Sequence, residues 1–438
     1  MPPAAEAIAP PGRLAQLRAS ESAKAAGLAA AQLLNNAVQL AFTVVFTRLL
    51  GQAGYGTLAA AVSAFIVLMV AGQSVQVAAA REAALDRLGH PDVLRATLRA
   101  WVQKLGLAQG HGEPGDHDER EPLAALFGIP ESPWTAAAVP PTGVLWVLIS
   151  LQRGALQGLR AYRLVGITIV LEAVGRLACG LALYAAGLGI AGAFLGATLS
   201  FALLALALEV ALHRRIGPVT HHPQHAAPRT LRSLVGDGWI GIVGLFLLAA
   251  LQNVDVIVAK RELEAGAAGS YAAAAVAAKA VVWVAIGIGL HLLPEATRRA
   301  SAGLDPRPVL LRALAILAAV ATPGLLIFFV ASDLVLRLAF GAEYVEAAGA
   351  LPLLGLAMAL IACAYLAVQY MVALGERRFL YVLGAIAVAE PFVLSALDLG
   401  ITGFASVVFG IQAVAALAAL GLGLRARWVP SRALPIEA

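Results

Sequence analysis

The sequence predicts an all-α polytopic membrane protein, and three observations carry that prediction. Of the 438 residues, 60% are hydrophobic and only 13% are charged, whereas about a quarter of the residues in soluble domains are charged. The apolar residues form continuous runs of roughly the 20 residues that an α-helix needs to cross about 30 Å of hydrocarbon. The runs are rich in Ala, Leu and Gly and lack the alternation of membrane β-strands. Helices are therefore the expected spanning elements.

Eleven runs qualify as clear membrane spans. Glycines lie at several of the short connections between them, for example at Gly51 and Gly187, and these connections indicate antiparallel neighbours. The runs, in chain order, cover residues 26–47, 57–80, 141–158, 164–187, 188–212, 238–259, 269–293, 313–332, 347–374, 379–397 and 399–424.

The distribution of Lys and Arg predicts the orientation, because these residues accumulate in cytoplasmic loops. Basic clusters precede the first run and follow the second, the fifth and several later runs. Both termini are then cytoplasmic in a multi-pass protein of the bacterial plasma (inner) membrane. These loops account for the net charge of +5, so no nucleic-acid partner is expected. Only four basic residues are expected on the opposite side of the membrane, namely Arg48, Lys260, Arg261 and Arg337.

Two cytoplasmic termini require an even number of crossings, so a twelfth is expected. It falls near residues 93–115, where the sequence is polar and the helix is degenerate. An internal repeat leads to the same number. The segment LQGLRAYRLVGITIVLEAV from Leu156 resembles VALGERRFLYVLGAIAVAE from Val372, and LGIAG at Leu188 matches LGITG at Leu399. Two copies in one orientation predict two six-helix lobes as parallel repeats about an axis along the membrane normal.

The predicted organisation has five parts. The tails and the linker between the lobes are expected on the cytoplasmic side. The parts are an N-terminal tail (1–25), a first helical lobe (26–215), a linker (216–235), a second helical lobe (236–427) and a C-terminal tail (428–438).

Three segments resemble a known family. They are FTRLLGQAGYGTLAAA at Phe42, LQNVDVIVAKRELEAGAAGSYAAAAVAAKA at Leu251 and the helix pair from Leu351 to Arg378. They are similar to the polysaccharide (O-antigen, Wzx-like) flippases of the multidrug/oligosaccharidyl-lipid/polysaccharide (MOP) exporter superfamily, over roughly residues 25 to 425. The resemblance implies two six-helix lobes around a cavity that opens alternately to the two sides. It also implies transport of a polyprenyl-diphosphate-linked oligosaccharide for the synthesis of surface polysaccharide such as lipopolysaccharide.

Polar groups inside the spans are the candidate functional residues, because an ionisable group at the bilayer centre is costly and rarely faces lipid. In the first run, Gln32, Asn35, Asn36 and Gln39 recur at spacings of three and four and share one helix face. The stripe is interpreted either as a cavity wall that binds substrate or as a seam of interhelical hydrogen bonds.

The first lobe also holds interior charges. Arg153 lies near the cytoplasmic end of its run, where a long side chain can snorkel to the headgroups, and this interpretation is preferred to substrate binding. Glu172 and Arg176 are one turn apart and can pair. Self-neutralisation of this pair is slightly preferred. In the alternative, Arg176 binds diphosphate and Glu172 takes up a proton.

In the second lobe, Lys279 lies in the middle of its run and is expected to bind either a carboxylate partner, Asp255 or Glu390, or an anionic ligand. Asp255 and Glu390 are candidates for coupling transport to H⁺ or Na⁺. Arg153, Arg176 and Lys279 are the interior bases suited to a phosphate group. Three prolines are candidate bending points, Pro323, Pro352 and Pro391.

The leading hypothesis is a transporter, not an enzyme, that acts as a monomer on a lipid-linked saccharide in contact with membrane lipid. No cofactor and no metal site are expected, since the histidines near His111 and His221 are interpreted as parts of solvated loops. The alternatives are a multidrug (MATE-like) cation antiporter, a membrane glycosyltransferase or polymerase that uses polyprenyl-phosphate sugars, and a degenerate scaffold.

Overall fold

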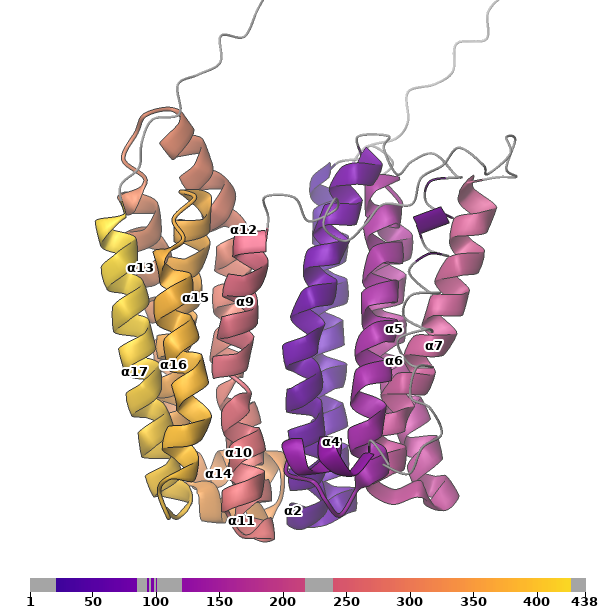
Figure 1. Ribbon diagram of the computed structural model, residues 1–438, viewed down its shortest axis with the longest axis vertical. Coiled ribbons are helices and arrows are strands. Elements are labelled where there is room, and N and C mark those ends of the chain that lie inside the picture. The colour runs from indigo at the N-terminus through magenta and orange to yellow at the C-terminus, as the bar shows by residue number, and fades with distance from the viewer. Residues whose placement is uncertain are drawn as a thin grey trace, which may run out of the picture.

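The chain folds into two bundles of helices that stand side by side (Figure 1). The computed structural model describes residues 21–84, 93, 96–97, 100, 120–216 and 239–426, and within these residues it contains helices and short turns but no strand. One bundle, here the first lobe, consists of α2 (Glu21–Ala84), α4 (Arg120–Leu126), α5 (Pro133–Gly158), α6 (Tyr162–Leu183), the π-helix η1 (Tyr184–Leu188) and α7 (Gly189–Ile216).

The second lobe contains the remaining helices. They are α9 (Trp239–Leu251), α10 (Val254–Glu262), α11 (Ala265–Ala278), α12 (Ala280–Ser301), α13 (Arg307–Val330), α14 (Ser332–Ala339), the 3₁₀-helix η4 (Ala342–Ala347), α15 (Leu351–Ala373), α16 (Arg378–Ser395) and α17 (Ile401–Arg425). The prediction of an all-α polytopic membrane protein is confirmed.

Glycines divide the longest helices into separate crossings. A straight helix of the 64 residues of α2 would be about 96 Å long, three times the hydrocarbon thickness. Gly51 interrupts it with φ 63° and ψ −179°. Gly187 (φ 90°) and Gly189 (φ 53°) likewise join α6 to α7. Positive φ carries no steric penalty for glycine, so the chain reverses at the short connections that the sequence predicted.

Nine helical segments in the described ranges are long and apolar enough to span a membrane. Two of them, Ala30–Ala80 and Tyr162–Arg215, contain these glycine reversals and so represent two crossings each. Counted in this way, the described residues contain eleven candidate crossings, the number that the hydropathy pattern predicts. The degenerate third helix near 93–115 lies outside the described residues, except that Val93, Ala96, Thr97 and Ala100 are helical.

Two of the predicted spans are interrupted. The run 238–259 is split into α9 and α10 at Gln252 and Asn253, and the run 269–293 is split where α11 and α12 meet at Lys279. The Asn253 side chain donates a hydrogen bond from Nδ2 to the carbonyl of Ala249 at 2.8 Å. Such local bonds compete with the regular helix ladder. Polar residues in the sequence thus mark the positions of both breaks.

The three candidate prolines have different roles. Pro323 lies inside α13 and Pro391 inside α16, so both stay candidate bending points. Pro352 instead lies in the first turn of α15. A first-turn position needs no intrahelical N–H bond and suits proline, so the expectation that Pro352 bends this helix is wrong.

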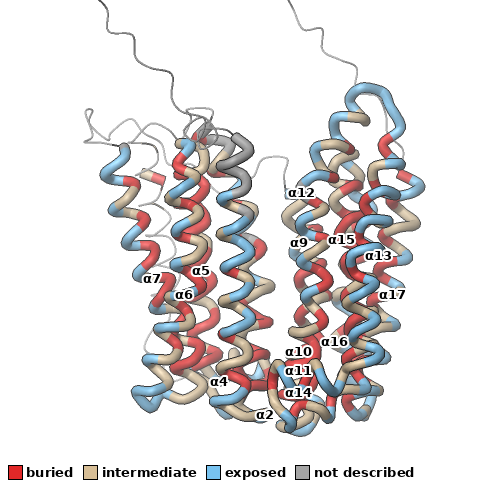
Figure 2. The backbone as a smooth tube through the Cα atoms, turned by 180° about the vertical axis from the view of Figure 1, so that it is seen from behind, coloured by how far each residue is buried: buried red, intermediate tan, exposed pale blue. Residues whose placement is uncertain are grey.

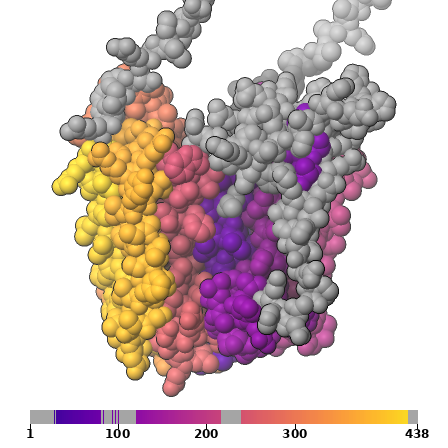
Figure 3. Space-filling view, viewed as in Figure 1, coloured from indigo at the N-terminus to yellow at the C-terminus, as the bar shows by residue number. Residues whose placement is uncertain are grey.

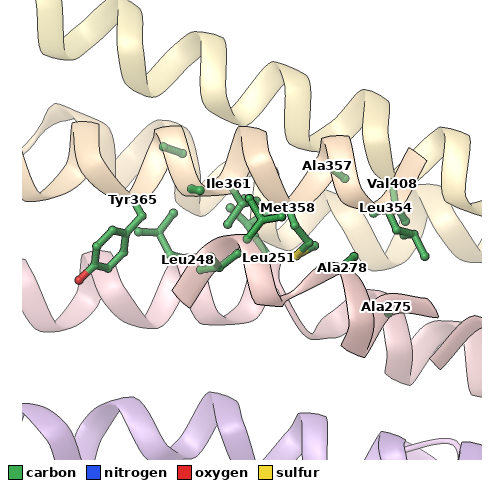
Figure 4. Close-up of a cluster of buried hydrophobic side chains, with 14 of the residues drawn as sticks. Leu248, Leu251, Ala275, Ala278, Leu354, Ala357, Met358, Ile361, Tyr365 and Val408 are labelled. Atoms are coloured by element: carbon green, nitrogen blue, oxygen red, sulfur yellow. The ribbon is translucent and has the colours of Figure 1, made fainter. Parts of the chain in front are cut away.

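Each lobe has its own buried core, and Figure 2 shows the buried residues along the inner faces of the helices. In the second lobe Leu248, Leu251, Met358 and Ile361 interdigitate between α9 and α15 (Figure 4). Large apolar side chains also face outward, among them Val330 and Phe392. An exposed apolar belt of this kind marks a surface that faces lipid.

Four predicted features cannot be compared with the fold. The linker 216–235 except Ile216, the C-terminal tail and both histidine clusters lie outside the described residues, as does the N-terminal tail up to residue 20. Residues 21–25 begin α2.

Candidate functional site

A buried charge cluster lies inside the first lobe, between α5 and α6. The Arg153 side chain donates from Nη1 to Glu172 Oε2 at 2.6 Å and from Nε to Thr168 Oγ1 at 3.1 Å. Its Nη2 also donates to the Thr168 carbonyl at 2.6 Å. Arg153 is only 3% exposed, so the expectation that it snorkels to the headgroups is wrong. Glu172 neutralises the guanidinium inside the lobe, so the Arg153 side chain does not have to extend to the hydrated headgroups.

Arg176 lies one turn further along α6 and has a different environment. Its Nη2 donates to Gln39 Oε1 of α2, and its guanidinium lies 5.0 Å from the ring centroid of Phe42. Its Nε is buried and has no partner among the described residues. The ion pair of Glu172 is formed with Arg153, so the preferred pairing of Glu172 with Arg176 is wrong. Among the described residues the cluster therefore contains two guanidinium groups and one carboxylate, a formal charge of +1.

The amide stripe of α2 is divided between two environments. Gln39 accepts the bond from Arg176, and Asn35, one turn away, is buried with its Oδ1 unpartnered within the described ranges. Gln32 donates instead to Asn36 Oδ1 at 3.1 Å in an exposed position. Only the half of the stripe that contains Asn35 and Gln39 is thus associated with the buried charges.

The second polar cluster lies at the breaks in the second lobe. Lys279, where α11 meets α12, donates from Nζ to Asn253 Oδ1 at 2.8 Å, and Asn253 lies in the break between α9 and α10. Gln412 of α17 donates to the carbonyl of Leu251, the last residue of α9, at 2.6 Å. The hydrogen bond of Lys279 goes to an amide because the two helix breaks face each other, while Asp255, one of its two predicted carboxylate partners, interacts with it electrostatically. Interrupted helices of this kind form ion and substrate sites in transporters.

Two buried carboxylates belong to the same cluster. Asp255 accepts a hydrogen bond from the Tyr271 hydroxyl at 2.7 Å, and Glu390 accepts one from Gln412 at 3.0 Å. The second oxygen of each, Asp255 Oδ1 and Glu390 Oε2, is buried without a partner in the described parts of the chain. Two acids with neutral partners and free oxygen atoms are suited to accept a proton or a cation.

Several residues of these clusters were not singled out from the sequence as site residues, namely Thr168, Asn253, Tyr271 and Gln412. Gln412 carries a recognisable signal, because it is a lone amide in an apolar run of 25 residues. Tyr271 and Thr168 carry none, since hydroxyl groups are common in helices that pack through small residues.

The two lobes meet at one end of the molecule, at the bottom in Figure 1 and Figure 3. This region, here the latch, joins the Gly51 bend of α2 to α10, α11 and η4. Gln52 donates to Ser270 Oγ and to the Glu343 carbonyl, both at 2.7 Å. A Cβ at Gly269 would lie 1.9 Å from the Gln52 carbonyl oxygen, and one at Gly56 would lie 3.1 Å from the Gly269 nitrogen. Glycine therefore permits α2 and α11 to approach closely.

An ion pair reinforces the latch. Glu131, in the turn between α4 and α5, binds Lys260 Nζ of α10 at 2.7 Å and accepts a bond from Thr57 of α2 at 2.6 Å. Burial alone would raise the pKa of Glu131, but the hydrogen bonds from Lys260 and Thr57 outweigh it and lower the pKa. Arg48 donates to the Leu338 carbonyl at 3.3 Å in the same region. At least two of the four cations predicted on the outer side thus take part in the contact between the lobes.

Comparisons with known proteins agree with this architecture. Residues 122–294 match the family model of polysaccharide biosynthesis proteins, and this range contains Arg153, Glu172, Arg176 and Lys279. No curated protein sequence matches the chain.

Solved structures share the fold across most of the chain. An inward-facing multidrug-resistance MATE transporter of the MOP superfamily is 14% identical, with a TM-score of 0.67, covering 89% of this chain and 94% of that one. The lipid II flippase MurJ in an inward closed conformation is 12% identical, with a TM-score of 0.62, covering 91% and 87%. A MOP transporter from Pyrococcus furiosus, described as having a binding pocket of reverse polarity, is 16% identical, with a TM-score of 0.54, covering 93% and 96%.

These findings confirm the resemblance that the sequence motifs indicated. The likeness to the solved structures is one of fold, since all three identities are below 20%. The chain therefore has the fold of the MOP-superfamily membrane transporters, and its residues 122–294 match the family of polysaccharide biosynthesis proteins.

Proposed function

We propose that this protein moves a polyprenyl-diphosphate-linked oligosaccharide across the inner membrane by alternating access. The observation that carries the proposal is the first-lobe cluster, in which Glu172 pairs with Arg153 whereas Arg176 is bonded to the neutral amide of Gln39. An excess positive charge in a membrane interior requires an anionic partner, and the diphosphate of a lipid-linked saccharide is such a partner. Arg176, with its unpartnered Nε, is the residue best placed to bind it.

The latch supports the mechanism of alternating access. The distribution of Lys and Arg assigns the latch to the outer side of the membrane, so the described conformation is closed to the outside. Opening towards the outside would require separation of the glycine contact between α2 and α11 and of the Glu131–Lys260 pair. The first contact joins two helices and the second joins the turn between α4 and α5 to α10, and both would separate if one lobe rocked against the other.

Asp255 and Glu390 supply the proposed coupling site for H⁺ or Na⁺. The second-lobe cluster contains one base, Lys279, and these two acids. A cation or proton bound at one of the carboxylates would therefore neutralise it. Its effect on transport would come through the helix breaks, because Gln412 bonds both Glu390 and the last carbonyl of α9.

The proposal is tested by reconstituting the purified chain in proteoliposomes with a fluorescent polyprenyl-diphosphate saccharide and measuring its translocation. Arg176→Gln should reduce the initial rate at least tenfold. The matched control is Arg163→Gln, on the exposed side of the same helix, which should retain the wild-type rate. Equal rates for the two variants would contradict a diphosphate site at Arg176.

A cation-extruding antiporter is the second candidate, and the two buried acids of the second lobe are the observation that favours it. In that case efflux of cationic dyes from vesicles would depend on Asp255 and Glu390 and would be unaffected by Arg176→Gln. Dye efflux without saccharide translocation would establish the antiporter in place of the flippase.

A further inference from the structure

A pocket of about 480 Å³ lies between α12 and α13, near the turn that joins them. This turn is at the end of the second lobe opposite the latch, because α11 begins at the latch and α12 continues away from it (Figure 1). Ile288, Leu292, Glu295 and Arg298 line the pocket from α12 at the spacing of a single helix face. The pocket shares no lining residue with either polar cluster described above.

The lining changes from apolar to basic along the helices. Ile288 and Leu292 of α12 and Ile316 of α13 line the part nearer the membrane centre, together with one polar residue, His291, whereas Arg298, Arg299 and Arg312 line the part nearer the turn. Ten residues separate Ile288 from Arg298, a distance of about 15 Å along a helix. A ligand that fits this gradient has an anionic group at one end and hydrocarbon at the other.

The charges in the pocket are only partly compensated. Glu295 accepts hydrogen bonds from Arg298 at 2.8 and 3.0 Å and from Arg299 at 3.1 Å. Arg312 makes no hydrogen bond or ion pair with any residue that the structure describes, and its side chain is exposed. Three arginines against one carboxylate leave a charge of +2, so the basic part of the pocket favours an anion such as a phosphate.

We propose that the pocket is a binding site for an anionic phospholipid of the cytoplasmic leaflet, with the headgroup phosphate on Arg312 and Arg298 and the acyl chains along Leu292 and Ile316. Basic pockets between membrane helices on the cytoplasmic side bind such headgroups. The Lys and Arg distribution assigns this end of the protein to the cytoplasm. The inference does not depend on the transported substrate, because the pocket shares no lining residue with the two polar clusters.

The test is native mass spectrometry of the full-length protein with phosphatidylglycerol or phosphatidylcholine. Wild-type protein should retain phosphatidylglycerol in preference to phosphatidylcholine. Arg312→Gln should weaken that retention about fivefold, the effect expected for loss of one cation near a lipid phosphate. The matched control is Arg307→Gln, in the first turn of the same helix and absent from the pocket lining, which should bind as the wild type does. Equal retention by Arg312→Gln, or equal binding of the two lipids, would overturn the proposal.

Two further arms address folding and the identity of the ligand. Ile316→Trp fills the apolar part of the pocket and keeps every charge, and it should also reduce retention of phosphatidylglycerol. Retention by this variant at the wild-type level would place the lipid elsewhere. Addition of a polyprenyl diphosphate should not displace phosphatidylglycerol. If it does so at equimolar concentration, the pocket belongs to the transported lipid and the proposal of a resident phospholipid is wrong.

Discussion

The two lobes repeat one architecture but compensate their buried charges in opposite ways. In the first lobe a helix of the repeat, α6, carries Glu172, and its partner is the guanidinium of Arg153 at 2.6 Å. In the second lobe the corresponding helix, α16, carries Glu390, and its partner is the neutral amide of Gln412 at 3.0 Å. The first carboxylate thus has a counter-charge in contact with it, whereas the second has a neutral hydrogen-bond donor. Under the proposed function, this difference suits the first lobe to anion binding and the second to ion coupling.

The largest effect is expected from Glu172→Gln, which leaves Arg153 and Arg176 buried without a counter-charge. Removal of one partner from a buried ion pair costs about 3–5 kcal/mol, so the variant should unfold at a clearly lower temperature in detergent. Glu390→Gln in the second lobe is the matched control and should unfold close to the wild-type temperature. Similar losses for the two variants would show that the lobes hold their carboxylates in the same way.

A second prediction concerns the contact that joins the lobes. Gly269→Ala places a Cβ against the Gln52 carbonyl oxygen, and neither helix backbone yields at that position without separating. The latch should open, and transport should fall at least tenfold. Spin labels on the two sides of the latch would report a longer distance. Gly287→Ala, which has open space around it, should leave both the distance and the rate unchanged.

A third prediction concerns coupling. Glu390→Gln should fold normally and make transport insensitive to the gradient of H⁺ or Na⁺ across proteoliposomes, because the acid that is bonded to Gln412 can no longer change its charge. Glu376→Gln, at the exposed turn before the same helix, is the control. If the rate of Glu390→Gln still follows the ion gradient, the coupling site lies outside this cluster.

The smallest effect is expected at the latch ion pair. The pKa of Glu131 is lowered below its ordinary value of 4.5, so the pair is complete above that pH and is lost as the pH falls through the lowered pKa. Lys260→Gln should reduce this pH dependence of latch opening, although Thr57 still donates to Glu131, and should weaken the closed state by about 1 kcal/mol, because Lys260 is buried and Glu131 is partly exposed. Glu262→Gln serves as the control. Latch opening that depends on acid in Lys260→Gln as in the wild type would exclude Glu131 as its source.

Much of the fold was predictable from the sequence. Hydropathy is a property of each segment alone, so the eleven runs, the glycine turns at Gly51 and Gly187 and the repeat were evident without coordinates. The breaks at Gln252–Asn253 and Lys279 were marked by polar residues but not predicted as breaks, because a single polar residue costs too little to identify an interrupted span.

The sequence by itself determined which charged residues lie inside the membrane, and only the tertiary structure decided their partners. The spacing of Glu172 and Arg176 allowed an ion pair within α6. The packing of α5 against α6 instead places Arg153 in contact with Glu172. Lys279 is bonded to Asn253 because two helix breaks meet. The latch likewise depends on the approach of Gly56 to Gly269 across more than 200 residues of chain. The rotation of each helix about its axis and the distance between neighbouring helix backbones decide which polar side chains pair. Neither quantity can be read from the sequence pattern of a single helix.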